Sequence, residues 1–147
     1  MPQRDNRQVA HRFPPTIVAE PEEWVSTTPD RHKIIYLACP YTHPDHTVRE
    51  QRFRLATQAA AELIRQGHIV YSPITMTHPI DVVMAEGTET LGSDYWVQFD
   101  EAFMAVCAEM VILQIEGWDE SRGIQREIDY FHSKGKPVRF MLMSRDA

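Results

Sequence analysis

The chain has 147 residues, of which 43% are hydrophobic and 24% are charged. This composition is typical of a globular protein, and the length suits a single domain with one core. The formal net charge is -6, from 21 acidic and 15 basic residues, which argues against a protein that mainly grips nucleic acid and favours a small-molecule ligand. No apolar run approaches the roughly 20 residues that span a bilayer, and charges interrupt residues 1–13, where a signal peptide would be apolar. We therefore predict a cytoplasmic protein that binds neither nucleic acid nor membrane.

Residues 1–32 are predicted to form an extended amino-terminal arm, and residues 33–147 the folded domain. The arm holds five of the ten prolines and shows no sustained helical or strand period. Its few apolar side chains suffice to dock against the domain or a neighbouring subunit, but not to build a core: Phe13, Ile17, Val18, Trp24 and Val25. The arm is therefore expected to be dispensable for folding.

The folded domain is predicted to begin with a strand, a loop and a helix. Residues 34–38 form a nearly continuous apolar run, as in a parallel strand that is buried on both faces. Thr47 and Glu50 have the spacing of a capping box, so the helix should start near Thr47 and stop at Gly67. Between these points, apolar residues recur at three- and four-residue steps.

The remainder of the chain repeats this alternation. Residues 68–72 are predicted to be a second strand, and residues 73–92 an irregular lid or pocket wall with one short helix at 80–85. The later elements are predicted as a helix from Ser93 to about residue 106, a strand at 110–113, a helix from Ser121 to Gly135 and a strand at 138–142.

Strands that alternate with helices predict an α/β fold. We expect a Rossmann/flavodoxin-like parallel sheet of about four or five strands, with helices on both faces. In such sheets, ligands bind beyond the carboxyl ends of the strands, where the strand order reverses. This rule indicates two loops, at residues 38–46 and 116–123.

The second of these loops leads into a helix that carries an acidic residue one turn later. Gly123 lets a ligand approach the first amides of that helix, which favour an anion such as phosphate. Glu127 lies on the same face as Gly123 and Ile124, so its carboxylate should reach a sugar whose phosphate sits at the helix start. The alternative is a solvated helix glutamate and a glycine that only shapes a turn. An exposed glutamate there contributes only about 0.3–1 kcal/mol, so Glu127→Gln is expected to change stability little.

Motifs spread over residues 33–142 resemble those of the nucleoside 2-deoxyribosyltransferase-like family. The matching features are Ile35-Tyr36-Leu37-Ala38-Cys39-Pro40, Arg52, Asp100, Gly123 with Glu127-Ile128, and Gly135-Lys136-Pro137-Val138. Similar ACPY and GW-xx-S-x-G loops occur in bacterial and phage proteins of a branch described as a domain of unknown function. The family includes transferases that exchange bases between deoxynucleosides and hydrolases that cleave nucleoside monophosphates.

The resemblance implies roles for individual residues. Glu127 matches the glutamate that attacks the anomeric carbon, Asp100 is the expected second acid, and Tyr36 matches a tyrosine beside the nucleophile. The expected contacts with substrate or phosphate are Ala38, Pro40, Tyr41, Arg52, Trp118, Ser121 and Gly123. Ile124 and Asp129 depart from the family pattern, and they leave the base and the choice between ribose and deoxyribose open. The resemblance also implies a homo-oligomer.

Neither a metal nor an organic cofactor is predicted. His43, Asp45 and His46 share a loop, with His78 elsewhere, but their spacing is not that of a known metal motif. Contact with a substrate phosphate or base is the better interpretation of these histidines. The only two cysteines, Cys39 and Cys107, lack a CxxC spacing and are expected to be reduced and structural.

These observations predict a nucleoside or nucleotide N-glycosidase or 2-deoxyribosyltransferase. Hydrolysis is favoured over transfer, because Ser121, Gly123 and Arg52 offer a phosphate site. The alternative is a non-catalytic nucleotide-binding or sensing domain on the same fold.

Overall fold

A computed structural model of the protein describes residues 29–88 and 91–143. Four parallel strands form one sheet: β1 (Ile34–Ala38), β2 (Ile69–Tyr71), β3 (Glu109–Leu113) and β4 (Val138–Met141). Their order in the sheet is β2-β1-β3-β4. The α/β fold with a Rossmann/flavodoxin-like parallel sheet is therefore confirmed. The predicted arm lies outside the described residues, apart from residues 29–32.

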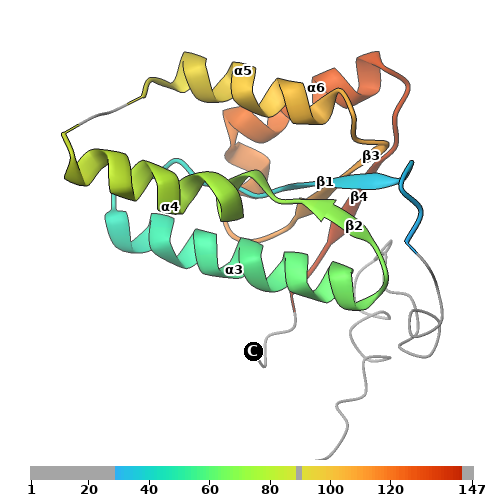
Figure 1. The fold of residues 1–147 in the computed structure, drawn as a ribbon, viewed down its shortest axis with the longest axis horizontal. Coiled ribbons are helices and arrows are strands. Elements are labelled where there is room, and N and C mark those ends of the chain that lie inside the picture. Colours follow the sequence, from blue (N-terminus) through green and yellow to red (C-terminus); the bar gives the residue numbers. More distant parts are fainter. Residues whose placement is uncertain (1–28, 89–90, 144–147) are drawn as a thin grey trace, which may run out of the picture.

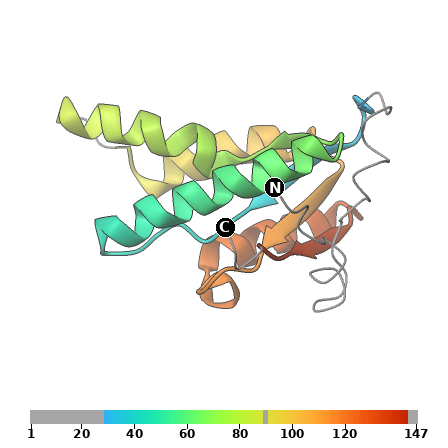
Figure 2. The same ribbon diagram turned by 90° about the horizontal axis from the view of Figure 1, so that it is seen from below.

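Four α-helices cover the two faces of the sheet in pairs (Figure 1). Helices α3 (His46–Arg65) and α4 (Pro73–Glu86) run side by side on one face, as Figure 2 also shows. Helices α5 (Ser93–Met104) and α6 (Arg122–Ser133) lie on the other. None of the helices in the described part of the chain combines the length and the apolar character needed to cross a bilayer.

The central strand β1 explains why both faces need covering. Its side chains alternate in direction, as in any strand. Ile35 and Leu37 pack into the core beneath α3, whereas Tyr36 and Ala38 pack into the core beneath α5 and α6. All four are buried, which explains the continuous apolar run in the sequence.

The start of α3 differs from the predicted capping box. Asp45 is the N-cap, and its side chain accepts a hydrogen bond of 2.8 Å from the Thr47 amide. The Glu50 carboxylate bonds to His78 on α4, so it does not fold back onto the helix start. Asp45 and Thr47 are both N-cap residue types, and the contact with α4 decides where the Glu50 side chain points.

The prediction that residues 73–92 are mainly irregular was wrong, because α4 occupies Pro73–Glu86. Pro73 follows the N-cap Ser72 and occupies the first helical position, where a missing amide proton costs nothing. The helix continues through Pro79 although proline removes one backbone hydrogen bond. Burial of Ile74 and His78 against α3 compensates for that loss, and the sequence of the segment alone does not show this packing.

The order of the strands creates a crevice at one edge of the sheet. From β1, the chain crosses through α3 to β2 on one side and later returns to β3 on the other side of β1. The connections after β1 and β3 therefore turn to opposite faces and leave a crevice between the carboxyl ends of these strands. The two loops that the sequence indicated lie at this edge.

Candidate active site

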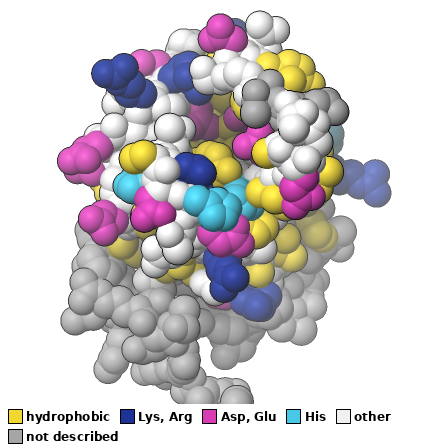
Figure 3. All heavy atoms as spheres, turned by 90° about the vertical axis from the view of Figure 1, so that its left-hand side faces the viewer, with side chains coloured by type: hydrophobic (Ala, Val, Ile, Leu, Met, Phe, Trp, Pro, Cys, Tyr) yellow, Lys and Arg dark blue, Asp and Glu magenta, His cyan; other side chains and the backbone are white. Residues whose placement is uncertain are grey.

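A cavity of about 810 Å³ lies at the carboxyl ends of β1 and β3. Its walls are the loop after β1, helices α4 and α5, and the loop and first turns that lead into α6. Figure 3 looks onto this side of the molecule, where the surface is hollowed and acidic, basic and histidine side chains gather around the hollow. A volume of this size accommodates a small-molecule ligand.

Glu127 faces the cavity from the second turn of α6 and is only partly exposed. The protein around it excludes water, and this burial raises the pKa of its carboxyl to about 7. The nearby charge of Asp100 also raises the Glu127 pKa, whereas the Tyr36 hydroxyl and the Arg126 guanidinium lower it. Glu127 is therefore not the solvated helix glutamate of the alternative interpretation.

Asp100 reaches the same cavity from α5. Burial raises its pKa to about 6, and the positive charge of Arg126 opposes this shift. One carboxyl oxygen, Oδ1, is buried and lacks a hydrogen-bond partner among the described residues. Two carboxyls with raised pKa values thus share one wall, which is a recurrent feature of acid–base sites.

The Tyr36 hydroxyl lies near both carboxyls, although the residue is fully buried in β1. Burial raises the Tyr36 pKa well above its usual value, and the charges of Glu127 and Asp100 raise it further. The hydroxyl stabilises the ionised Glu127 but misses full hydrogen-bond geometry, and it has no hydrogen-bond partner within the described part of the chain. Buried hydroxyls without partners are rare, so Tyr36 offers an unused donor beside Glu127.

The first turn of α6 supplies backbone amides to the cavity. Ser121 is the N-cap, and its hydroxyl accepts a hydrogen bond of 3.2 Å from the Ile124 amide. The amides of Arg122 and Gly123 are those that helix geometry leaves open for a ligand. Ser121, Gly123 and Glu127 all line the cavity, and the shared face of Gly123 and Glu127 is the one that their helical spacing predicted.

Arg52 connects the two loops at the mouth of the cavity. Its guanidinium donates to the Thr42 carbonyl at 3.1 Å and to the Glu116 carbonyl at 3.3 Å. Gly117, next to Glu116, has φ 92°, and a Cβ there would lie 2.7 Å from Nη2 of Arg52. The resemblance implied a phosphate contact for Arg52. In the structure, the Arg52 guanidinium lies at the cavity wall and links the two loops through these hydrogen bonds.

Two predicted contact residues lie away from the cavity. Ala38 is 1% exposed within β1 and belongs to the core. Trp118 packs edge-on against Phe140, with 5.5 Å between the ring centroids, and it does not line the cavity. Pro40 and Tyr41 do line it. Both predicted loops reach the cavity, but the side chains of Ala38 and Trp118 point towards the core and those of Pro40 and Tyr41 point towards the cavity.

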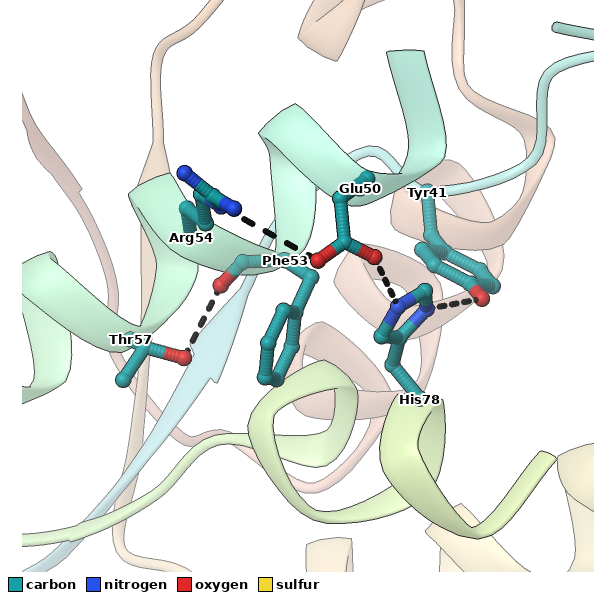
Figure 4. A network of polar contacts seen from close by, with 6 residues as sticks. All are labelled: Tyr41, Glu50, Phe53, Arg54, Thr57 and His78. Atoms are coloured by element: carbon teal, nitrogen blue, oxygen red, sulfur yellow. Dashed lines mark hydrogen bonds and ion pairs between the residues drawn. The ribbon is translucent and has the colours of Figure 1, made fainter. Parts of the chain in front are cut away.

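The sequence predicted residues 73–92 as a pocket wall and His78 as a substrate contact, but it missed Asp81 and the helix that presents both side chains. His78 and Asp81 of this helix line the cavity, and His78 joins Tyr41 and Glu50 through hydrogen bonds (Figure 4). The four-residue steps Ile74–His78 and Thr77–Asp81 were the available signal, because such steps place residues on one helical face. The prolines of the segment led to an irregular prediction instead. No group of three or more His, Cys, Asp or Glu side chains in the described ranges is arranged to hold a metal ion.

Comparison with known proteins places the chain in a family. No curated protein matches it. Residues 33–143 match the model of a family described as a domain of unknown function, DUF1937. This match begins at the start of β1 and ends just after β4, so it includes every strand and helix that surrounds the cavity. The chain is therefore a member of the DUF1937 family.

Proposed function

We propose that the protein cleaves the N-glycosidic bond of a nucleoside or nucleotide and passes the sugar to water or to a second base. The observation that carries the proposal is the pairing of Glu127 and Asp100, with raised pKa values, in a cavity at the reversal of strand order. The motif resemblance to nucleoside 2-deoxyribosyltransferases supports the same chemistry.

In the proposed reaction, the Glu127 carboxylate attacks the anomeric carbon of the sugar. The bond from this carbon to the base nitrogen breaks, its electron pair stays with the base, and Asp100 supplies a proton to the departing base. A glycosyl ester on Glu127 results. Water, or the nitrogen of another base, then attacks the anomeric carbon, its proton passes to Asp100, and Glu127 leaves as a carboxylate.

The electrostatics of the pair set how many protons it holds near neutral pH. Both pKa values lie near neutrality, at about 7 for Glu127 and about 6 for Asp100, and two close carboxylates repel each other. The pair therefore holds one proton around pH 6 to 7. Because the Glu127 pKa is the higher of the two, this proton lies mainly on Glu127, and the reactive form, with the proton on Asp100, is the minor one at equilibrium. The Tyr36 hydroxyl increases the share of the reactive form because it stabilises the charge on Glu127.

A phosphate at the start of α6 would orient the substrate. The open amides of Arg122 and Gly123 and the positive end of the helix dipole favour an anion, one turn before Glu127. This arrangement favours nucleoside monophosphates, and hydrolysis over transfer, within the proposed function.

The experiment is to incubate the protein with a panel of nucleosides and nucleoside monophosphates and to measure free base by chromatography. We expect release of base from at least one monophosphate, and adding a second base tests transfer through the appearance of a new nucleoside. Glu127→Gln should abolish release while binding persists, because the phosphate and base contacts are made elsewhere.

Asp129→Asn is the matched control for this substitution. It changes a carboxylate to an amide on the exposed side of the same helix, where Asp129 accepts a hydrogen bond from Gln125. Its activity should remain normal. Nucleotide binding without release of base by the unaltered protein would refute cleavage and leave the cavity as a binding site.

The proposal includes a cytoplasmic homo-oligomer. Apolar side chains at helical spacing are exposed along α4, namely Met76, Ile80 and Val83, with exposed fractions of 42%, 39% and 65%. Such a stripe is suited to contact with a second subunit. Light scattering is expected to give a mass above the 17.1 kDa of one chain, and a monomer would contradict this part of the proposal.

A further inference from the structure

A chain of three hydrogen-bonded side chains, two of which (Tyr41 and His78) line the cavity, joins the loop after β1 to α3 and α4 (Figure 4). The Nε2 atom of His78 lies 2.8 Å from Oε2 of Glu50, and Nδ1 of His78 lies 2.6 Å from the Tyr41 hydroxyl oxygen. The His78 ring is 4% exposed and stacks on Phe53 with 4.5 Å between the ring centroids. We call these residues the Glu50–His78–Tyr41 chain.

The charge on Glu50 determines which atoms of this chain donate hydrogen bonds and which accept them. The hydrogen bond from His78 lowers the pKa of Glu50, so Glu50 is ionised near neutral pH and only accepts hydrogen bonds. His78 must therefore donate through Nε2. In a neutral imidazole the other ring nitrogen then only accepts, so the Tyr41 hydroxyl donates its proton to Nδ1 of His78.

This direction fixes what Tyr41 can offer to a ligand. The hydroxyl of Tyr41 already donates its only hydrogen to His78, so its oxygen can only accept a hydrogen bond from a ligand. Asp81 lies three residues after His78, lines the same cavity and adds a second acceptor. Burial raises the Tyr41 pKa, the charges of Asp81 and Glu50 raise it further and that of Arg49 opposes them, so the phenol stays protonated.

The two arginines near this wall both donate to backbone carbonyls. Arg49 donates to the His43 carbonyl and lines a smaller cavity of about 350 Å³, which Tyr41 and Asp81 also line. Arg52 donates to the carbonyls of Thr42 and Glu116. The wall made by Tyr41 and Asp81 thus presents acceptors to the large cavity, which the carboxyl pair also lines.

We propose that the Glu50–His78–Tyr41 chain makes this wall a recognition site for a hydrogen-bond donor, the exocyclic amino group of a nucleobase. The inference rests on the proposed function. If the phosphate lies at the start of α6 and the sugar beside Glu127, the base extends towards Tyr41 and Asp81. Amino-bearing bases such as adenine and cytosine match the two acceptors, whereas hypoxanthine and uracil present a carbonyl oxygen at the same ring position.

The test compares matched ligands that differ in this group and in the adjacent ring nitrogen, which carries a hydrogen only in hypoxanthine and uracil. Affinities for adenosine against inosine monophosphate, and for cytidine against uridine monophosphate, are measured by calorimetry at pH 8. Both ribose and deoxyribose forms are used, on the Glu127→Gln background so that no ligand is consumed. We expect the better amino-bearing ligand to bind about three- to tenfold more tightly than its carbonyl partner, the effect of one neutral hydrogen bond.

Two substitutions should remove this preference. Tyr41→Phe deletes the acceptor and keeps the ring, so the preference should fall towards unity. Glu50→Gln allows the new amide to donate to Nε2 of His78, which turns the Tyr41 proton towards the cavity and should abolish or reverse the preference. Glu62→Gln, on the same helix and paired with Arg65 away from both cavities, should leave the preference unchanged.

Nitrogen NMR of the full-length protein at the same pH tests the chain without a ligand. The inference requires the Nε2–H form of His78, and the Nδ1–H form would overturn it. Equal or reversed binding of the matched ligands by protein with unaltered Tyr41 and Glu50 would also overturn it, even where base release and its loss in Glu127→Gln uphold the proposed function. Preferential binding of amino-bearing nucleotides without any base release would uphold the inference and refute cleavage. Failure of every nucleotide to bind would refute both.

Discussion

Replacing Glu127 by glutamine is expected to stabilise the fold in alkaline solution. The carboxyl pKa rises from 4.5 to about 7 on folding, so the folded protein resists ionisation of this group. A raised carboxyl pKa contributes stability below about pH 4.5, and this contribution disappears as the pH rises through 7. The neutral amide of Glu127→Gln escapes this loss.

The size of the effect follows from the pKa change. At about 1.4 kcal/mol for each pH unit between the two pKa values, the ionised carboxylate costs about 3 kcal/mol above pH 7. Partial exposure of Glu127 and the lost contact with the Tyr36 hydroxyl reduce the expected gain to about 1–3 kcal/mol at pH 8. At pH 5, where the carboxyl is mostly protonated in the folded protein, the gain should fall below about 1 kcal/mol.

Urea denaturation at pH 8 and pH 5 measures both values, and Asp129→Asn provides the control with an exposed carboxylate. Its stability should change by less than about 0.5 kcal/mol at either pH. If Glu127→Gln is no more stable than its parent at pH 8, the carboxylate of Glu127 is surrounded by water and not by protein atoms. A gain that is equal at the two pH values would refute the electrostatic origin.

Further predictions concern activity, the loops and the arm. The kcat/KM of base release should be highest between about pH 6 and pH 7 and fall on both sides, because the pair must hold one proton; a rate that climbs steadily beyond pH 8 would argue against Asp100 as the acid. Gly117→Ala should cost about 1–2 kcal/mol in thermal or urea unfolding, because φ 92° is strained for alanine and the new Cβ meets Arg52; unchanged stability would mean that the loop adapts freely. Hydrogen exchange should show residues 117–123 protected by an added nucleotide, and protection confined to residues 1–32 would place the ligand elsewhere. Removal of residues 1–32 should leave a cooperative melt, and a molten or insoluble product would move the domain boundary.

The sequence predicted those parts of the fold whose pattern is local. The apolar run of β1 and the cap at Ser121 are strong signals, because burial on both faces and helix capping act within a few residues. The strand-order rule then indicated the two loops at the edge of the sheet where the cavity lies. Helix α4 escaped prediction because its stability comes from packing of Ile74 and His78 against α3, which overrides the two prolines.

In the candidate site, too, the sequence predicted local features but not contacts between distant segments. Helical spacing placed Glu127 on the same helix face as Gly123, but spacing does not show how deeply a side chain is buried. From the sequence we expected Glu127→Gln to change the free energy of unfolding little. The burial of Glu127 in the structure leads us to expect a larger change. The Glu50–His78–Tyr41 chain joins three separate segments, and no local pattern reveals such a contact. Trp118 lies in the predicted loop, yet its ring turns to Phe140, because side-chain direction within a loop depends on the core beside it.

The proposed reaction requires Glu127 to form a covalent bond to the sugar. This bond is tested by the mass of the peptide that contains Glu127, taken from protein quenched in acid during turnover of a nucleotide that releases base. We expect this peptide to gain the mass of one glycosyl group, and we expect no such gain in Glu127→Gln. A glycosyl group on another residue, or base release at an undiminished rate by Glu127→Gln, would contradict the proposed reaction.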